Sequence, residues 1–232
     1  MNIFYTPELQ SMQYEMTEEE SKHCIRVLRK ALGDKISLVD GKGTFFTAEI
    51  INDNPKHCVV AVIDKTSQVN RSEFINIAIA PTKNTDRIEW FLEKCTEIGI
   101  NSIYLMKTEN SERTNIKTER LEKLIISAMK QSLKAHKPLI HELITFNELL
   151  KATSGYAQKY IAYCDEAPEK VFLPDVYKKG SKTIVLIGPE GDFSATEVAL
   201  AKKIGYKVVS LGESRLRTET AGMVACTIMN CM

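Results

Sequence analysis

Two short loops near the end of the chain carry the residues best suited to chemistry. The loop at residues 188–192 holds two glycines, a proline and the Glu190 carboxylate, and the loop at residues 212–220 holds Arg217 and Glu219. Glycine lets the backbone approach a ligand without a Cβ in the way, and proline stiffens a turn. Ordinary turns with solvated charges use the same residue types, but the two loops together favour a ligand site.

The segments around these loops predict how they are positioned. Each loop follows a short apolar run typical of a buried strand, Thr183–Ile187 and Val208–Leu211. Ser194 and Glu197 form a capping box, which predicts a helix directly after the first loop. In an open α/β sheet, loops at the carboxyl ends of neighbouring strands border the ligand crevice.

Several common kinds of site are not indicated. The chain lacks the G-x-G-x-x-G and G-x-x-x-x-G-K-[ST] fingerprints of nucleotide sites, and it lacks the G-x-S-x-G elbow of hydrolases. Its four histidines form no H-E-x-x-H, and their spacing to cysteines matches no zinc pattern. We therefore expect no metal.

Composition sets outer bounds on the protein. A chain of 232 residues suits one large or two small domains, and a net charge of +1 gives no global attraction for nucleic acid. Six cysteines without a C-x-x-C pair are typical of reduced core residues. No secretory segment or membrane-spanning apolar run occurs, so we expect a cytoplasmic protein with no membrane partner.

The first part of the chain predicts a small β-rich domain with one helix. Strands are expected at residues 2–5, 36–39, 44–50 and 58–63, with a hairpin turn at residues 40–43. Thr17 and Glu20 form a capping box for a helix that ends near residue 33. Arg26 and Arg29 belong to a basic stripe on this helix, which suits RNA contact but also suits any solvated helix face.

The second part alternates strands and helices after a polar linker at residues 66–71. Strands are predicted at residues 75–80, 102–106 and 160–163, and helices at residues 86–98 and 118–135. Such alternation is typical of a mostly parallel sheet covered on both faces. The predicted domains are therefore residues 1–68 and 72–232 of an α/β protein.

The loop motifs resemble those of the RsmE family. They recur in order at matching spacing, as Leu186–Gly191, Phe193-Ser-x-x-Glu197, Leu211–Gly212 and Leu216–Ala221. These enzymes are SPOUT-class methyltransferases that use S-adenosyl-L-methionine to methylate N3 of one uridine in 16S ribosomal RNA of the small subunit. The resemblance implies a C-terminal SPOUT domain with a deep trefoil knot, an N-terminal PUA-like RNA-binding β-barrel, and a homodimer. General topology rules alone would favour an unknotted sheet.

The resemblance also implies roles for particular residues. The cofactor pocket would be lined by Cys164, Gly188, Pro189, Glu190, Gly191, Leu211, Gly212, Leu216, Arg217 and Thr220. The catalytic candidates are Arg217, Glu190 and Glu219. A fixed cation such as Arg217 suits the nucleobase anion that forms when the weakly acidic N3 proton leaves. Arginine stays protonated, so Glu190 or Glu219 would accept the proton, although Glu219 also suits a helix N-terminus.

RNA contacts are expected from basic residues. The set is Arg26, Arg29, Lys83, Arg87 and Arg113, and each could equally be a solvated surface charge. The sequence departs from the family pattern at three places: Asp192 replaces a second glycine, Leu133-Lys134 replaces a glycine followed by an arginine, and Ser214-Arg215 replaces an arginine followed by an aliphatic residue. The alternatives are a SPOUT enzyme for another RNA position and a non-catalytic ribosome-assembly protein. The presence of Arg217 and the loop glycines favours an enzyme.

Overall fold

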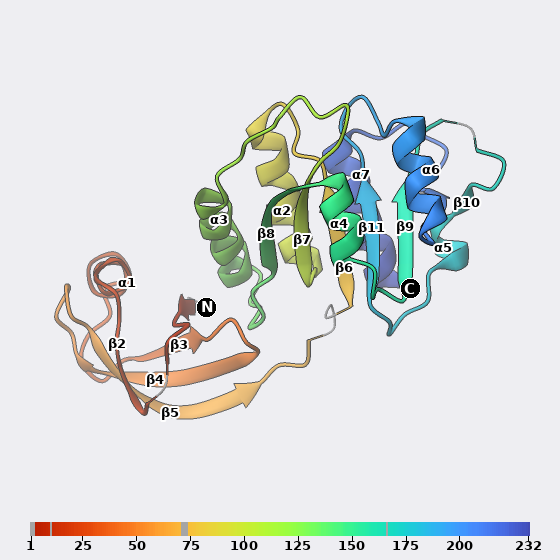
Figure 1. Cartoon of the computed structure of the whole chain (residues 1–232). Coiled ribbons are helices and arrows are strands. Elements are labelled where there is room, and N and C mark those ends of the chain that lie inside the picture. The colour runs from red at the N-terminus through yellow and green to blue at the C-terminus, as the bar shows by residue number, and fades with distance from the viewer. Residues whose placement is uncertain (1–2, 10, 71–73, 166) are drawn as a thin grey trace. The chain divides into compact units, whose positions relative to one another are not determined.

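The chain folds into two compact units (Figure 1). The computed structural model describes residues 3–9, 11–70, 74–165 and 167–232. The first unit comprises residues 1–70 and 126–137, and the second comprises residues 71–125 and 138–232. Two predicted positions, Asn2 of the first strand and Arg71 of the linker, lie outside the described residues.

The first unit is built on a curved five-stranded sheet. Its strands are β1 (Ile3–Tyr5), β2 (Gln13–Glu15), β3 (Lys35–Val39), β4 (Thr44–Asn52) and β5 (Val59–Ser67), in the order β1-β3-β4-β5-β2. The predicted hairpin forms, and the Asp40 carboxylate accepts hydrogen bonds from the backbone of Lys42 and Thr44 at 2.7 and 3.0 Å. The predicted linker at residues 66–71 begins too early, because residues 66–67 belong to β5 and pair with β4.

The helix of the first unit differs from the prediction. α1 (Glu18–Lys22) begins at Thr17, whose hydroxyl accepts a hydrogen bond from the Glu20 amide at 3.3 Å, but the chain then continues as a π-helix, His23–Val27. A π-helix has more residues per turn than an α-helix, and Arg29 leaves it with φ +55°. The predicted basic stripe is therefore wrong, because Arg26 and Arg29 do not lie on one α-helix. Both side chains are nevertheless exposed.

The second unit contains an all-parallel seven-stranded sheet, which confirms the predicted architecture. Its strands are β6 (Ile75–Ile79), β7 (Ser102–Lys107), β8 (Leu139–Thr145), β9 (Gln158–Ala162), β10 (Val171–Phe172), β11 (Thr183–Ile187) and β12 (Lys207–Ser210). Their order is β10-β12-β9-β11-β6-β7-β8. β8 was not predicted, because this edge strand mixes polar and apolar residues and has no fully buried residue.

Helices cover both faces of this sheet (Figure 1). They are α2 (Thr85–Ile98), α3 (Thr118–Gln131), α4 (Phe146–Ala152), α5 (Leu173–Val176), α6 (Ala195–Lys203) and α7 (Thr218–Cys231). Side chains alternate along β11, so Val185 and Ile187 pack on the α2 and α7 side while Ile184 and Leu186 pack on the α4 and α6 side. Each such burial contributes about 1.5–3 kcal/mol, which explains why the central strands are continuously apolar.

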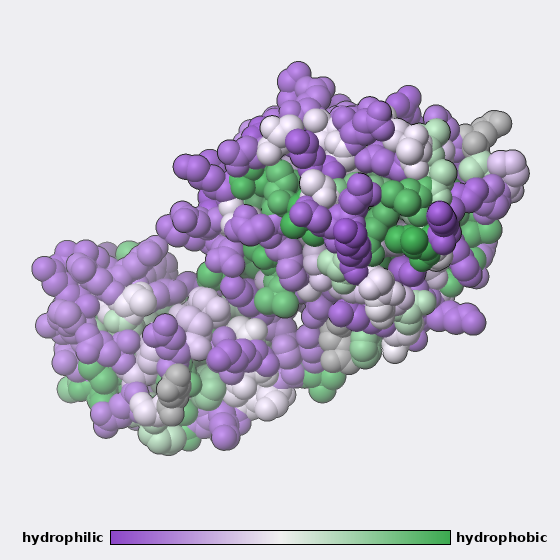
Figure 2. Space-filling view, in the orientation of Figure 1, coloured by the Kyte–Doolittle hydropathy of each residue, from purple (hydrophilic) through white to green (hydrophobic). Residues whose placement is uncertain are grey.

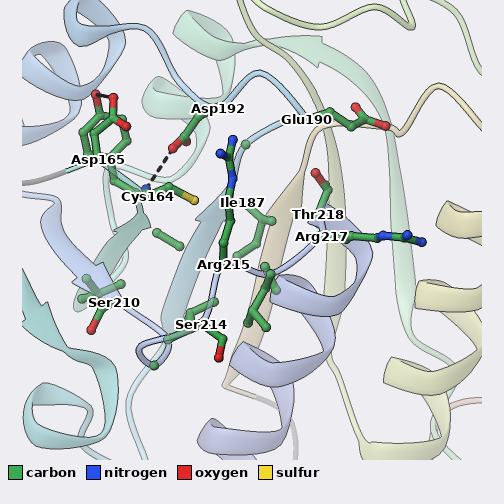
Figure 3. A pocket seen from close by; sticks show the side chains of 18 of the residues that line it. Cys164, Asp165, Ile187, Glu190, Asp192, Ser210, Ser214, Arg215, Arg217 and Thr218 are labelled. Carbon is green, nitrogen blue, oxygen red and sulfur yellow. Dashed lines mark hydrogen bonds between the residues drawn. The ribbon is translucent and has the colours of Figure 1, made fainter.

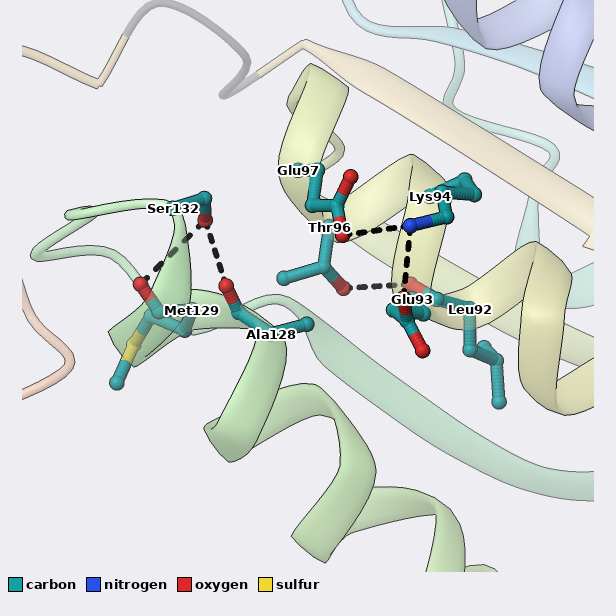
Figure 4. A network of polar contacts seen from close by, with 8 residues as sticks. All are labelled: Leu92, Glu93, Lys94, Thr96, Glu97, Ala128, Met129 and Ser132. Atoms are coloured by element: carbon teal, nitrogen blue, oxygen red, sulfur yellow. Dashed lines mark hydrogen bonds and ion pairs between the residues drawn. The ribbon is translucent and has the colours of Figure 1, made fainter.

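α3 ends four residues earlier than predicted. Its last residue is Gln131, Leu133 adopts φ +55°, and the Ser132 hydroxyl donates to the carbonyl of Ala128 at 2.7 Å (Figure 4). A residue in the left-handed region cannot continue a right-handed helix. The turn at residues 132–134 thus stops α3 before Pro138 is reached.

The packing of α7 on α2 brings the start of α7 to the carboxyl edge of the sheet. Gly222 makes the close approach possible, because a Cβ there would lie 2.5 Å from Cε2 of Phe91. At the other end, Asn230 donates to the Gly99 carbonyl at 2.7 Å, just where Gly99 (φ +127°) terminates α2. On the outer side of α2, Lys94 pairs with Glu93 and Glu97 (Figure 4).

Hydrophilic residues cover most of the surface seen in Figure 2, with smaller apolar patches between them. Exposed large apolar side chains of the second unit include Trp90, Phe172, Leu200 and Ile204. None of the helices within the described residues is long and apolar enough to cross a membrane.

Candidate active site

A cavity of about 550 Å³ lies at the carboxyl ends of β9, β11 and β12. The chain runs through β6, β7 and β8 in one direction across the sheet, and then places β9 and β11 on the other side of β6. The cavity lies on that other side, where the loops after the neighbouring strands β12, β9 and β11 surround it. The volume falls within the range of about 300–1,000 Å³ that small-molecule sites occupy.

The loop after β11 forms one wall of this cavity. Gly188 leaves little room for a side chain, since a Cβ would lie 3.1 Å from both Oδ1 of Asp192 and Cδ2 of Phe193. The Asp192 amide donates to the Pro189 carbonyl at 3.0 Å, which closes a tight turn. Gly191 lies outside the cavity wall, where its carbonyl accepts a hydrogen bond from Asn110 at 3.2 Å.

Asp192 ties this loop to the loop after β9. Its carboxylate accepts hydrogen bonds from the backbone amides of Cys164 and Phe193, both at 2.8 Å. Lys170 supports the same loop by donating to the carbonyls of Cys164 and Asp165 at 3.2 and 2.9 Å. Partial burial and the neighbouring Asp192 carboxylate raise the pKa of the Cys164 thiol. The thiol is therefore neutral near pH 7 and poorly suited to act as a nucleophile.

The loop after β12 supplies two of the cations that line the cavity, Arg215 and Arg217. It leads into α7, with Arg217 at the N-cap position, and its Gly212 adopts φ +141°. Among the cavity-lining residues drawn in Figure 3, Cys164 and Asp192 lie on one side, Glu190 and Arg217 lie on the other, and Arg215 lies between them. The cavity thus has carboxylates on both sides and guanidinium groups in its wall.

The two candidate proton acceptors differ in environment. Glu190 is exposed, and its Oε1 accepts a hydrogen bond from the Lys83 amide at 3.2 Å. Glu219 is only 7% exposed, and its Oε1 lies 3.9 Å from Nε of Arg87. Oε2 of Glu219 is buried and makes no hydrogen bond to any residue that the structure describes. A buried carboxylate oxygen without a partner is costly and unusual in a folded protein.

Most of the residues predicted for the cofactor pocket line this one cavity. They are Cys164, Gly188, Pro189, Glu190, Leu211, Gly212, Leu216 and Arg217. Thr220 and Glu219 instead line a second, more open hollow on the other side of Arg217. The catalytic candidates are thus divided between two neighbouring cavities, with Arg217 bordering both.

The residues predicted to contact RNA have varied placements. Arg113 donates hydrogen bonds to the carbonyls of Thr82 and Lys83, at 3.0 and 2.5 Å, and so supports the loop after β6. Lys83 pairs with Glu112 at 2.9 Å. Arg87 lines both cavities, so it is more than a surface charge.

Sequence reasoning missed several residues of the site. The cavity wall also contains Asp165, Lys170 and Ser210, and the second hollow contains Trp90. The only signal for Trp90 was its status as the single tryptophan of the chain. Within the described residues, no group of three or more His, Cys, Asp or Glu side chains could hold a metal ion.

Comparisons with known proteins identify the family. A model of the RNA methyltransferase domain matches residues 70–230, and a model of the RNA methyltransferase PUA domain matches residues 16–63. The Bacillus subtilis protein named ribosomal RNA small subunit methyltransferase E is 25% identical over 229 residues, which cover 94% of this chain and 89% of that protein.

Two solved structures are similar along the whole chain. A probable rRNA-methyltransferase from Porphyromonas gingivalis is 46% identical with a TM-score of 0.92, covering 100% of this chain and 99% of the other. The ribosomal RNA small subunit methyltransferase E from Neisseria gonorrhoeae, bound to S-adenosyl methionine, is 26% identical with a TM-score of 0.87, covering 100% and 97%. The chain therefore belongs to the RNA methyltransferase family, and it is similar to proteins named ribosomal RNA small subunit methyltransferase E.

Proposed function

We propose that this protein uses S-adenosyl-L-methionine to methylate N3 of one uridine in 16S ribosomal RNA of the small subunit. The observation that carries the proposal is the glycine-walled cavity whose wall includes Arg217, a fixed cation beside a site for a small molecule. The names of the relatives support the substrate class, and the cofactor bound to the Neisseria gonorrhoeae protein supports the methyl donor.

The residues of the cavity suit this cofactor. A sulfonium cation is attracted by carboxylates, and Asp165, Glu190 and Asp192 all border the cavity. Backbone groups of residues 188–190 and 211–212 would hold the rest of the molecule, with no Cβ at Gly188 or Gly212 to obstruct it. When bound, the cofactor supplies an electrophilic methyl group, and the N3–C bond forms as the S–C bond breaks and leaves its electron pair on sulfur.

The protein's own residues would prepare the uridine for this transfer. N3 loses a proton that is about as weakly acidic as a tyrosine hydroxyl, whose pKa is about 10. Arg217 would stabilise the resulting nucleobase anion, and a carboxylate would accept the proton. The neutral Cys164 thiol argues against a mechanism in which a cysteine first attacks the base.

We also propose, on the family resemblance, that the chain forms a homodimer with a deep trefoil knot in the second unit, and that it acts in the cytoplasm. The exposed basic residues of the first unit, Arg26 and Arg29, would contact RNA phosphates. Sedimentation equilibrium measures the oligomeric state, and a strictly monomeric protein would contradict the dimer.

The test is transfer of a labelled methyl group to small ribosomal subunits from a strain that lacks the enzyme, with the modified nucleoside mapped. We expect 3-methyluridine at one site, and a loss of rate of about 100-fold or more in Arg217→Ala. Arg120→Ala is the matched control, since Arg120 is exposed and pairs with Glu89 outside both cavities. Cofactor binding without 3-methyluridine would refute the substrate, and a methyl group on another nucleotide would identify a different RNA position.

A further inference from the structure

The second hollow adjoins the cofactor cavity and has a different character. It is open, has a volume of about 570 Å³, and shares Arg87, Arg215, Leu216 and Arg217 with the cavity. Trp90 and Glu219 line the hollow but not the cavity. A group held in the hollow would therefore meet the cofactor across Arg217.

Trp90 offers a flat aromatic surface in this hollow. It lies on α2, whose apolar side chains Ile88, Phe91 and Leu92 are fully buried, whereas Trp90 remains 40% exposed. A tryptophan that is not buried in the hydrophobic core has a ring face available for stacking. Base stacking on an aromatic ring strengthens nucleic-acid binding by about 5- to 150-fold per base.

Glu219 favours a bound group that can donate a hydrogen bond. Because Oε2 is buried and has no hydrogen-bond partner among the described residues, the site lacks a donor at this atom. An ionised carboxylate only accepts hydrogen bonds, so the missing partner must present an N–H or O–H. A planar group with an N–H on its edge would satisfy both Glu219 and Trp90.

We propose that this hollow is the subsite for the target nucleobase, a uracil of RNA, stacked on Trp90 with its N3–H directed at Glu219. The proposal rests on the proposed function and deepens it. Glu219 takes the N3 proton, Arg217 stabilises the negative charge left on the base, and N3 is methylated from the adjoining cavity. The proposal assigns the proton to Glu219 and not to Glu190, because Glu190 lines the cofactor cavity but not the hollow, and its Oε1 accepts a hydrogen bond from the Lys83 amide.

The single tryptophan makes the stacking directly measurable. Titrating uridine 5′-monophosphate into the protein saturated with S-adenosylhomocysteine should quench the Trp90 fluorescence, and ribose 5-phosphate should not. This measurement needs no turnover, so it decides the subsite even if wild-type protein fails to methylate small subunits. Absence of quenching by the nucleotide would overturn the subsite. A spectrum that instead changes with protein concentration alone would assign the hollow to a second copy of the chain, and would also overturn it.

Enzyme kinetics separate the roles of the two residues. Trp90→Ala should lower kcat/KM for small subunits by about 10- to 100-fold, and Trp90→Phe should restore most of it because a ring remains. Glu219→Gln should lower kcat by about 100-fold or more, with KM for subunits little changed. The Kd for S-adenosyl-L-methionine should stay within about twofold in all three variants, which shows that the folded cofactor cavity is intact. Wild-type kinetics in Trp90→Ala or Glu219→Gln would refute the assigned role of that residue.

Discussion

Replacing Gly222 by alanine tests whether the close packing of α7 on α2 positions the active site. The added Cβ would lie 2.5 and 2.8 Å from Cε2 and Cδ2 of Phe91 and 3.3 Å from Cδ1 of Ile79. Carbon atoms in van der Waals contact lie about 3.5–4.0 Å apart. The helix or the ring must therefore move by about 1 Å, and neither Phe91 nor Ile79 has any exposed surface to move into.

The expected magnitude follows from two opposing effects. Overpacking a core costs about 1–3 kcal/mol, whereas alanine in a helix interior is favoured over glycine by about 1 kcal/mol. Because the neighbours of Gly222 are fully buried, we expect a net destabilisation of about 1–2 kcal/mol. For a chain of this size each kcal/mol lowers the Tm by about 2–4 °C, so the Tm should fall by about 2–8 °C.

Calorimetric unfolding of Gly222→Ala measures this effect, with Gly155→Ala as the control. Gly155 is exposed, and a Cβ added there would meet no heavy atom of the described residues within 4 Å apart from its chain neighbours, so its variant should stay within about 0.5 kcal/mol of wild type. Adding Phe91→Leu to Gly222→Ala should recover part of the loss by removing ring atoms. A Gly222→Ala protein as stable as wild type would refute the reasoning. The affinity for the cofactor should also fall, because Ala221 and Arg217 move with α7.

Two further predictions concern single side chains. Asp192→Gly should weaken binding of S-adenosyl-L-methionine by about 2- to 10-fold in calorimetry, because the Cys164 and Phe193 amides lose their acceptor; unchanged affinity would contradict this. Burial, assisted by Lys182, lowers the pKa of His141, so its stabilising contribution is complete above the unfolded pKa of about 6.5 and is lost as pH falls through the lowered pKa. When the pH is lowered from roughly 7.5 to roughly 5.5, the Tm of wild type should therefore fall more than the Tm of His141→Phe. Equal decreases would show that His141 does not take up a proton on unfolding.

Local sequence signals were reliable where the interaction is itself local. The Ser194 and Glu197 capping box is present in full, with hydrogen bonds of 3.3 and 3.0 Å between the two residues. The same signal exists at Thr145 and Glu148, where it would have predicted α4. In contrast, the π-helix His23–Val27 was not predicted; its buried residue, Cys24, belongs to a core cluster whose other members are distant in sequence.

Two positions at which the resemblance implies glycine share a backbone conformation. Leu133 and Asp192 adopt φ +55° and φ +59°. Glycine occupies this left-handed region without strain, whereas other residues pay about 1–2 kcal/mol. Asp192 offsets part of that cost through its two backbone hydrogen bonds. For Leu133 the structure shows no comparable compensation by its side chain, which is 45% exposed.

Residue types and their spacing were enough to predict the parallel α/β architecture and the two loops at the carboxyl ends of β11 and β12, since apolar periodicity, glycines and helix caps act over a few residues. Which carboxylate is buried, and which side chains meet, depends on how the helices and strands pack. Arg87 and Trp90 are more than 120 positions from Glu219 in the chain, and they share a hollow with it because α2 and α7 pack together. Burial and proximity of this kind depend on contacts distant in sequence, which residue types and spacing do not encode.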